Sequence, residues 1–154
     1  MASVARTRVW HDGHLTAKDF PLAEVSDHLA DEGAVVWADL VRPDAETLDQ
    51  LAEELSLDQH AIEDATTLHE RPKAVRYKSH LFVTAFAIGS VQGDSIAVSR
   101  VSAFLLPRGL VTVRLDDKFD MDAVVQQWDD NSDLIAAGPS LCATRADVCL
   151  RSRA

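Results

Sequence analysis

The stretch Ile62–Phe86, IEDATTLHERPKAVRYKSHLFVTAF, decides the fold that we expect for this chain. It opens with an acidic pair, Glu63-Asp64, in a pattern typical of a helix, and continues into a His-Glu-Arg-Pro-Lys turn. Pro72 has a fixed φ and no backbone N–H, so we expect it to end the helix, with the flanking basic residues near the negative helix end. The apolar run that follows predicts a strand buried on both faces.

The pattern outside this stretch alternates strands with helices. Predicted strands cover Val4–Trp10, His14–Thr16, Ala34–Ala38, Val75–Tyr77, Leu81–Ile88, Ile96–Leu106 and Leu110–Leu115. Predicted helices begin at Pro21, at Pro43 and after Ser56 or Asp58, and a last one covers Phe119–Trp128. This order predicts an α/β (α+β) fold, a mixed sheet covered by helices, with Ile96–Leu106 as a central strand.

Composition limits the classes of partner. The chain has 154 residues, a formal net charge of -10 and a pI near 4.9. This charge argues against binding nucleic acid or an anionic membrane surface, since both need a basic face. Cys142 and Cys149 are too far apart for a CxxC pair, which indicates a reduced, cytoplasmic protein. We expect a soluble chain, because no run approaches the roughly 20 apolar residues of a membrane helix and no signal peptide is present.

The candidate chemistry lies on the helix with the acidic pair. His60, Glu63 and Asp64 stand at i, i+3 and i+4, so they share one helix face. Magnesium prefers one or two carboxylates and keeps several waters, while an imidazole would favour Co²⁺ or Zn²⁺. The plainer interpretation of such a face is a solvated helix surface.

Three other patterns have simpler explanations than a ligand site. His11-Asp12-Gly13-His14 is typical of a hairpin turn with polar tips. The run that starts at Asp129 resembles a calcium loop, but Leu134 and Ser140 stand where that loop needs Gly and Glu. The tryptophans are expected in the core: Trp10, Trp37 and Trp128.

One known family shares the central pattern of an acidic pair, a spacer, a basic Pro-containing turn and an aromatic strand. The chain resembles the cytoplasmic N-terminal domain of CorA-type magnesium and cobalt transporters over about residues 30–138. The resemblance implies a mixed parallel and antiparallel sheet between helical layers. The matching residues are Glu63, Asp64, His69, Glu70, Arg71, Pro72, Lys73, Tyr77 and Leu81-Phe82.

The resemblance also implies a function. It places at Asp64 a regulatory Mg²⁺ site between subunits of a homopentamer, and at Glu63 a weaker neighbouring site. The expected cofactor is weakly bound Mg²⁺, with Co²⁺ or Zn²⁺ as alternatives, and the expected protein is a cation sensor, not an enzyme. In the family the partner carboxylate comes from a long helix of the next subunit, which has no counterpart in this sequence, so we expect half of each site.

The two ends of the resemblance set the expected domain organisation. Residues 1–138 are expected to form the domain, and residues 139–154 an atypical tail of truncated, vector-derived or frameshifted origin. The membrane helices and the Gly-Met-Asn motif of the family are absent, and Asp58-Gln59 replaces its usual His-Pro. In the intact protein we expect the domain at the cytoplasmic face of the cell membrane, attached through segments missing from this chain.

Two rival functions remain open from the sequence. One is a free-standing cytosolic binding module that uses the same fold. The other is a hydrolase that combines Asp64 with His60 or His69, although no nucleophile or oxyanion feature accompanies them.

Overall fold

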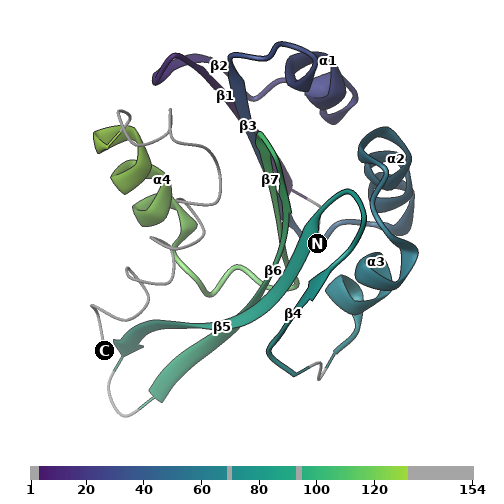
Figure 1. Ribbon diagram of the computed structural model, residues 1–154. Helices are drawn as coiled ribbons and strands as arrows, with labels where there is room; N and C mark the ends of the chain where they lie inside the picture. The colour runs from purple at the N-terminus through teal and green to yellow at the C-terminus, as the bar shows by residue number, and fades with distance from the viewer. Residues whose placement is uncertain (1–3, 69–70, 93–94, 132–154) are drawn as a thin grey trace.

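A seven-stranded mixed sheet forms the centre of the computed structural model, which describes residues 4–68, 71–92 and 95–131 (Figure 1). Its order is β2-β1-β3-β7-β6-β5-β4. The β3 and β7 strands pair in parallel and the other neighbours pair antiparallel, which confirms the mixed sheet. The strands are β1 Val4–His11, β2 His14–Lys18, β3 Ala34–Val41, β4 Lys73–Arg76, β5 Leu81–Gln92, β6 Ser95–Leu106 and β7 Gly109–Arg114.

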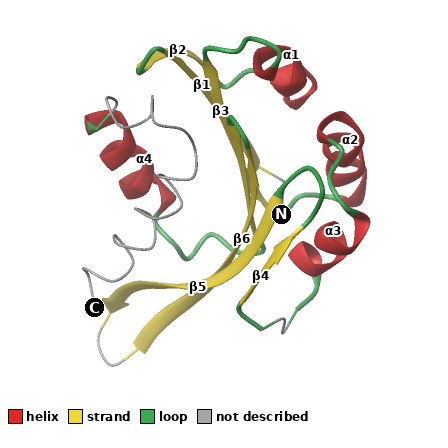
Figure 2. Ribbon diagram, viewed as in Figure 1, coloured by secondary structure: helices red, strands yellow, loops and turns green. Residues whose placement is uncertain are grey.

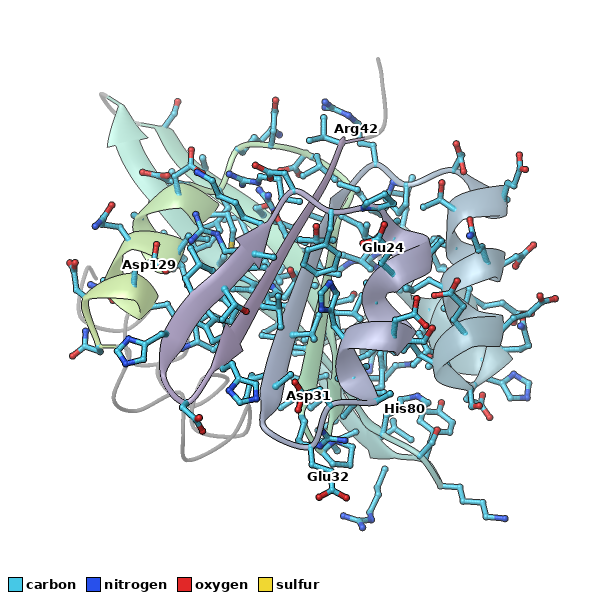
Figure 3. All side chains as sticks on the ribbon, turned by 90° about the horizontal axis from the view of Figure 1, so that it is seen from above. Glu24, Asp31, Glu32, Arg42, His80 and Asp129 are labelled. Carbon is cyan, nitrogen blue, oxygen red and sulfur yellow. The ribbon has the colours of Figure 1, made fainter. Side chains whose placement is uncertain are left out.

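Helices cover both faces of the sheet, as Figure 2 shows. One face carries α1, α2 and α3, and the opposite face carries α4. Seen from above, Glu24 lies on the side of the sheet that carries α1, α2 and α3, and Asp129 lies on the side that carries α4 (Figure 3). The sandwich expected from the family resemblance is therefore confirmed. The bounds are a 3-10 turn Leu22–Glu24, α1 Val25–Leu29, α2 Ala45–Leu55, α3 Gln59–Thr66 and α4 Met121–Asp130.

Each face has its own hydrophobic core. The larger core packs α1–α3 on the sheet, and the smaller one packs α4 on it. In the smaller core the Trp128 ring centroid lies 5.0 Å from that of Trp10 and 4.5 Å from that of Trp37. The prediction that the three tryptophans belong to the core is correct.

Aspartate side chains cap the N-termini of α2 and α3. The Asp44 carboxylate accepts a 2.7 Å hydrogen bond from Thr47 N at the start of α2. The Asp58 carboxylate accepts a 2.8 Å bond from His60 N at the start of α3. Of the two predicted caps for α3, Asp58 is the right one, since Ser56 ends α2 with a positive φ of 54°.

The prediction that Pro72 ends α3 is wrong. The helix stops at Thr66, and Thr67 adopts an extended backbone. The Glu63 carbonyl accepts hydrogen bonds from the Thr67 backbone N–H at 2.9 Å and from the Thr67 hydroxyl at 2.7 Å, so Thr67 makes the last helical hydrogen bond and caps it with its side chain. Pro72 instead lies just before β4, where a missing N–H ends strand pairing.

The expectation that the strand after the turn is buried on both faces is also wrong. Along β5, Phe82 and Thr84 are buried, while Phe86 and Ile88 on the same face are 45% and 51% exposed. The β5 strand lies next to the edge strand β4 and continues beyond it (Figure 1). In the described part of the chain, the half of β5 after Thr84 therefore has no neighbouring strand on that side to shield its side chains. The strands buried at every residue are β3 and β7. The predicted central strand, β6, lies inside the sheet between β7 and β5.

Candidate cation site on α3

The short helix α3 presents the acidic pair away from the core. Ala61, Ile62 and Ala65 are buried and pack into the larger core. On the other side Glu63 is exposed and Asp64 is half-buried. The helix period thus separates the two sets, as the sequence predicts.

An ion pair neutralises Asp64. Its Oδ2 lies 2.6 Å from Nζ of Lys73, the first residue of β4, and the two side chains are 22% and 31% exposed. The pair joins α3 to the sheet across the turn that contains Pro72. The carboxylate is therefore less open than a helix-surface position implies, and a cation that binds Asp64 must compete with an ammonium group.

The neighbourhood of this pair is acidic. The pKa of Tyr77 is raised above its ordinary value, first because the phenol is shielded from water and then because the carboxylates of Asp58 and Asp64 lie near it. Lys73 opposes this effect. The carboxylates of Asp58, Glu63 and Asp64 on α3 and its cap make the potential along this helix negative, and Lys73 offsets part of it.

The chain by itself supplies few ligands here. Within residues 4–68, 71–92 and 95–131, no group of three or more His, Cys, Asp or Glu side chains is arranged so that it could hold a metal ion. His60 is exposed on α3, and His69 lies outside the described residues. Asp64 and Glu63 are consecutive residues of α3, and their role as ligands stays a prediction; additional oxygen ligands would have to come from water or another chain.

The carboxyl end of α3 is held by a residue that sequence reasoning missed. Arg100 on β6 donates hydrogen bonds to the carbonyls of Thr67 and Ala65, the latter at 3.1 Å. The carbonyls at a helix C-terminus have no intrahelical partners, and that end carries a partial negative charge. A guanidinium donates hydrogen bonds to the carbonyls, and its positive charge is attracted to the helix end. Arg100 reaches the end of α3 because of the register of β6 in the sheet. The sequence around Arg100 therefore does not predict this contact.

A buried histidine locks the turn between β4 and β5 against the helical layer. His80 is 5% exposed, and its ring stacks on Tyr77 at a centroid distance of 5.1 Å. Ser79 Oγ lies 2.8 Å from the carbonyl of Ser56 and 2.9 Å from His80 Nδ1. The single Ser79 hydroxyl proton goes to that carbonyl, so Nδ1 carries the imidazole proton and donates.

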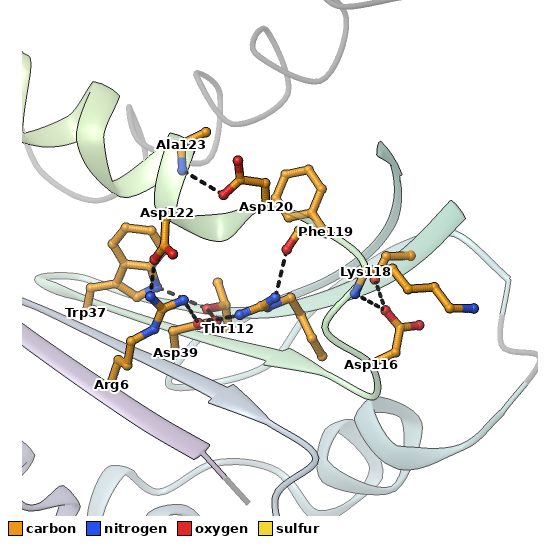
Figure 4. A network of polar contacts seen from close by, with 12 residues as sticks. Arg6, Trp37, Asp39, Thr112, Asp116, Lys118, Phe119, Asp120, Asp122 and Ala123 are labelled. Atoms are coloured by element: carbon orange, nitrogen blue, oxygen red, sulfur yellow. Dashed lines mark hydrogen bonds and ion pairs between the residues drawn. The ribbon is translucent and has the colours of Figure 1, made fainter. Parts of the chain in front are cut away.

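A second polar cluster lies under α4 (Figure 4). The Asp39 carboxylate on β3 is buried and accepts from Arg114 Nη2 and Thr112 Oγ1, each at 2.7 Å. Trp37 Nε1 donates to Thr112 Oγ1 at 3.0 Å. Both Asp39 oxygens are thus engaged by protein donors. The cluster therefore has a structural role, because its buried polar groups are hydrogen-bonded to one another. The sequence did not identify Asp39, because the residues around it form an apolar strand pattern.

Arginines of β1 extend this cluster to α4. Arg6 contacts both Asp39 and Asp122, and Arg8 Nη1 lies 2.7 Å from Asp129 Oδ2. Asp129, which begins the calcium-like run, therefore serves as an ion-pair partner in the structure. These contacts fix the second helical layer on the sheet.

Comparison with known proteins identifies the family. The sequence model described as CorA-like Mg2+ transporter protein matches residues 32–140, which is most of the chain. The chain therefore belongs to the CorA-like Mg²⁺ transporter family, a family of transporters and not of enzymes. No curated protein matches the chain.

Solved structures share the fold. The soluble domain of CorA from Methanocaldococcus jannaschii has a TM-score of 0.55 and 13% identity, covering 89% of this chain and 48% of that one. The complete CorA magnesium transporter from the same organism gives 0.58 and 12%, covering 82% and 37%. The full-length CmaX protein gives 0.56 and 13%, covering 96% and 47%. This chain thus spans less than half of each of them.

Among residues 4–68, 71–92 and 95–131, no helix has both the length and the apolar character needed to cross a bilayer.

Proposed function

We propose that this chain is the cation-sensing regulatory domain of a CorA-like divalent-cation transporter. Membership of the family over residues 32–140 carries the proposal, because that range contains the accessible acidic face of α3. In this proposal the domain lies at the cytoplasmic face of the membrane. The ion, Mg²⁺ or Co²⁺, passes through the membrane pore of the intact transporter.

Asp64 is the proposed principal ligand, and Glu63 contributes to a weaker neighbouring site. Magnesium dehydrates reluctantly and accepts one or two carboxylates with several waters, which fits a half-buried carboxylate beside an exposed one. In the intact homopentamer, carboxylates of an adjacent subunit would complete the coordination. Loss of the cation would leave like charges facing each other, which favours separation of the subunits.

Lys73 competes with the cation for the Asp64 carboxylate. When no cation is bound, its ammonium group neutralises Asp64 at 2.6 Å. A divalent ion must displace that ammonium group, so part of the attraction for the ion is lost. We therefore expect this chain to bind Mg²⁺ no tighter than roughly millimolar, a free energy of about -4 kcal/mol.

Thermal melts with and without Mg²⁺ test the proposal. At ~10 mM Mg²⁺ and a millimolar dissociation constant, the wild type should gain no more than about 1.5 kcal/mol of stability. Asp64→Ala should remove this gain. Asp49→Ala, which deletes an exposed carboxylate on α2, should keep it. An equal gain in the Asp64→Ala variant would exclude Asp64 as the ligand.

The same melts can rank the cations. His60 lies on the exposed side of α3 near the acidic pair, and an imidazole favours Co²⁺ or Zn²⁺ over Mg²⁺. If His60 joins the site, Co²⁺ should stabilise the wild type more than Mg²⁺ does, and His60→Gln should abolish the difference. An unchanged difference in that variant would remove His60 from the site.

A further inference from the structure

The outer edge of β5 lacks a partner strand along its far half. The β4 strand pairs with β5 only from Arg76 opposite Leu81 to Lys73 opposite Thr84. Continuing this register would place Pro72, which has no N–H to donate, opposite Ala85. On its inner side β5 pairs with β6 as far as Gln92. Among the described strands none pairs with the outer edge beyond Thr84, and Figure 1 shows the β5–β6 hairpin running past β4.

This free edge is uncharged and bordered by apolar side chains. Residues 85–92, AFAIGSVQ, contain no charged residue and no proline. On one face of the hairpin, Phe86, Ile88, Ile96 and Val98 are 45%, 51%, 61% and 49% exposed. Natural sheets protect such edges with lysine, proline or a covering element, because open N–H and C=O groups attract another strand. The chemistry of the edge therefore selects an extended, apolar strand as its partner.

We propose that this partner is the same strand of a second copy, paired antiparallel about a two-fold axis. The chain carries a net charge of -10, so two copies repel each other except where their surfaces are neutral. The β5 edge is such a place. A two-fold contact uses the same patch twice, and an antiparallel pair of identical strands is self-complementary.

The register follows from the positions of the apolar side chains. With Ala87 on the two-fold axis, Phe86 lies opposite Ile88 of the partner subunit, and Ile88 opposite the partner's Phe86. Aromatic and β-branched residues stabilise one another across strands. This register pairs residues 85–89 of the two copies, and it requires each β5 strand to bend away from the partner's β4 at the irregularity between Ile88 and Val91.

The contact should be weak and independent of metal. A ladder of five residues a side buries less than the ~800 Å² per partner of a standard interface. We expect a dissociation constant on the order of 0.1 mM. No carboxylate of α3 takes part, so Mg²⁺ and EDTA should leave the constant unchanged. Failure of the cation-sensing proposal would therefore not affect this one.

Sedimentation equilibrium from ~10 μM to ~1 mM tests the proposal. The 154-residue chain should pass from monomer to dimer. Phe86→Lys should weaken the dimer at least tenfold, because it places a charge opposite the apolar Ile88 of the partner subunit. Val98→Lys lies on the same face but on the interior strand β6, and Leu15→Lys lies on the opposite sheet edge; both should keep the dimer.

Three results would overturn it: a monomer at every concentration, a five-fold mass, or a dimer that Phe86→Lys leaves intact. Equal weakening by Val98→Lys would mean that a partner covers the apolar face instead of pairing with the edge. If Phe86→Lys does not fold, Ala87→Cys, with Cys142 and Cys149 changed to Ser, provides a second test. Directly opposed residues lie close enough for a disulfide, so the Ala87→Cys variant should cross-link under oxidation, whereas the Val98→Cys variant should not. Absence of the cross-link in the Ala87→Cys variant would overturn the proposed register.

Discussion

His80 illustrates how a single buried residue makes this domain sensitive to pH. Ser79 fixes its Nδ1 as the protonated nitrogen, which leaves Nε2 buried without a hydrogen-bond partner. A proton added to Nε2 would place a charge and an unsatisfied donor between Tyr77 and Phe104. Burial accordingly lowers the pKa of His80 below its ordinary value of 6.5, and the Asp58 carboxylate only partly opposes this.

The resulting prediction concerns stability against pH. Because the unfolded His80 binds a proton more readily than the folded one, its contribution to stability is complete above pH 6.5 and is lost as pH falls below that value. Denaturant titrations at ~pH 7.5 and ~pH 5.5 should show a larger loss in the wild type than in His80→Gln. His14→Gln, at an exposed position, should behave like the wild type. Equal losses in all three proteins would contradict the argument.

Lys73 offers a residue-scale test of cation competition. Lys73→Met removes the ammonium group that neutralises Asp64, so Mg²⁺ should bind about threefold to tenfold more tightly, a gain comparable to one ion pair at partly exposed positions. Titration calorimetry measures the change, and Lys78→Met provides a matched control in the following turn. Weaker Mg²⁺ binding in Lys73→Met would show that Lys73 does not compete for the site.

At the scale of elements, α3 shows which features the sequence could predict. Its buried side, its exposed acidic pair and its cap at Asp58 follow from local spacing. Its end does not, because Thr67 and Arg100 determine it through a side-chain hydrogen bond and a contact between residues 35 positions apart in the chain. The pairing of Asp64 with Lys73 was missed for a related reason: the sequence shows both residues but not the turn that brings them together.

The strands show the same division. The hairpin of β1 and β2 and the positions of β3, β5, β6 and β7 were predicted from apolar runs and turn residues. Burial of β5 on both faces was predicted wrongly, because the apolar composition of β5 does not show that this strand extends beyond its neighbour β4. The order of strands and helices and the family resemblance both indicated a mixed sheet, but neither gave the strand order or the parallel pairing of β3 with β7.

Arg100 provides the prediction at this scale. Arg100→Ala should destabilise the domain by about 1–2 kcal/mol, because two carbonyls at the end of α3 lose a charged donor. Arg76→Ala, an exposed arginine on the edge strand β4, should cost less than about 0.5 kcal/mol. Chemical denaturation compares the two variants, and similar costs would remove the special role of Arg100 as a helix cap.

At the scale of the whole molecule, the sheet carries two different connections to its helical layers. The α1–α3 layer rests on the larger apolar core. The α4 layer combines a smaller core with the polar network around Asp39 and the ion pairs of Arg6 and Arg8. Because Asp39 and Arg114 pair across the β3–β7 junction, the network also fastens the two halves of the sheet together.

Breaking this network should affect the whole fold. Asp39→Ala leaves Arg114 buried without its carboxylate and should cost about 3–5 kcal/mol of stability. Asp122→Ala removes a contact at an exposed position and should cost less than about 1 kcal/mol. Thermal and denaturant unfolding measure both variants. A small cost for Asp39→Ala would show that the buried pair contributes little to holding the layers.

A magnesium titration followed by amide NMR tests the central claim most directly. We expect chemical-shift changes concentrated in α3 and the start of β4, with a dissociation constant of roughly millimolar or weaker. These changes should disappear in Asp64→Ala and remain in Asp49→Ala. Shifts that persist in Asp64→Ala, or binding far tighter than millimolar in the wild type, would contradict the claim that this domain contributes half of a cation site centred on Asp64.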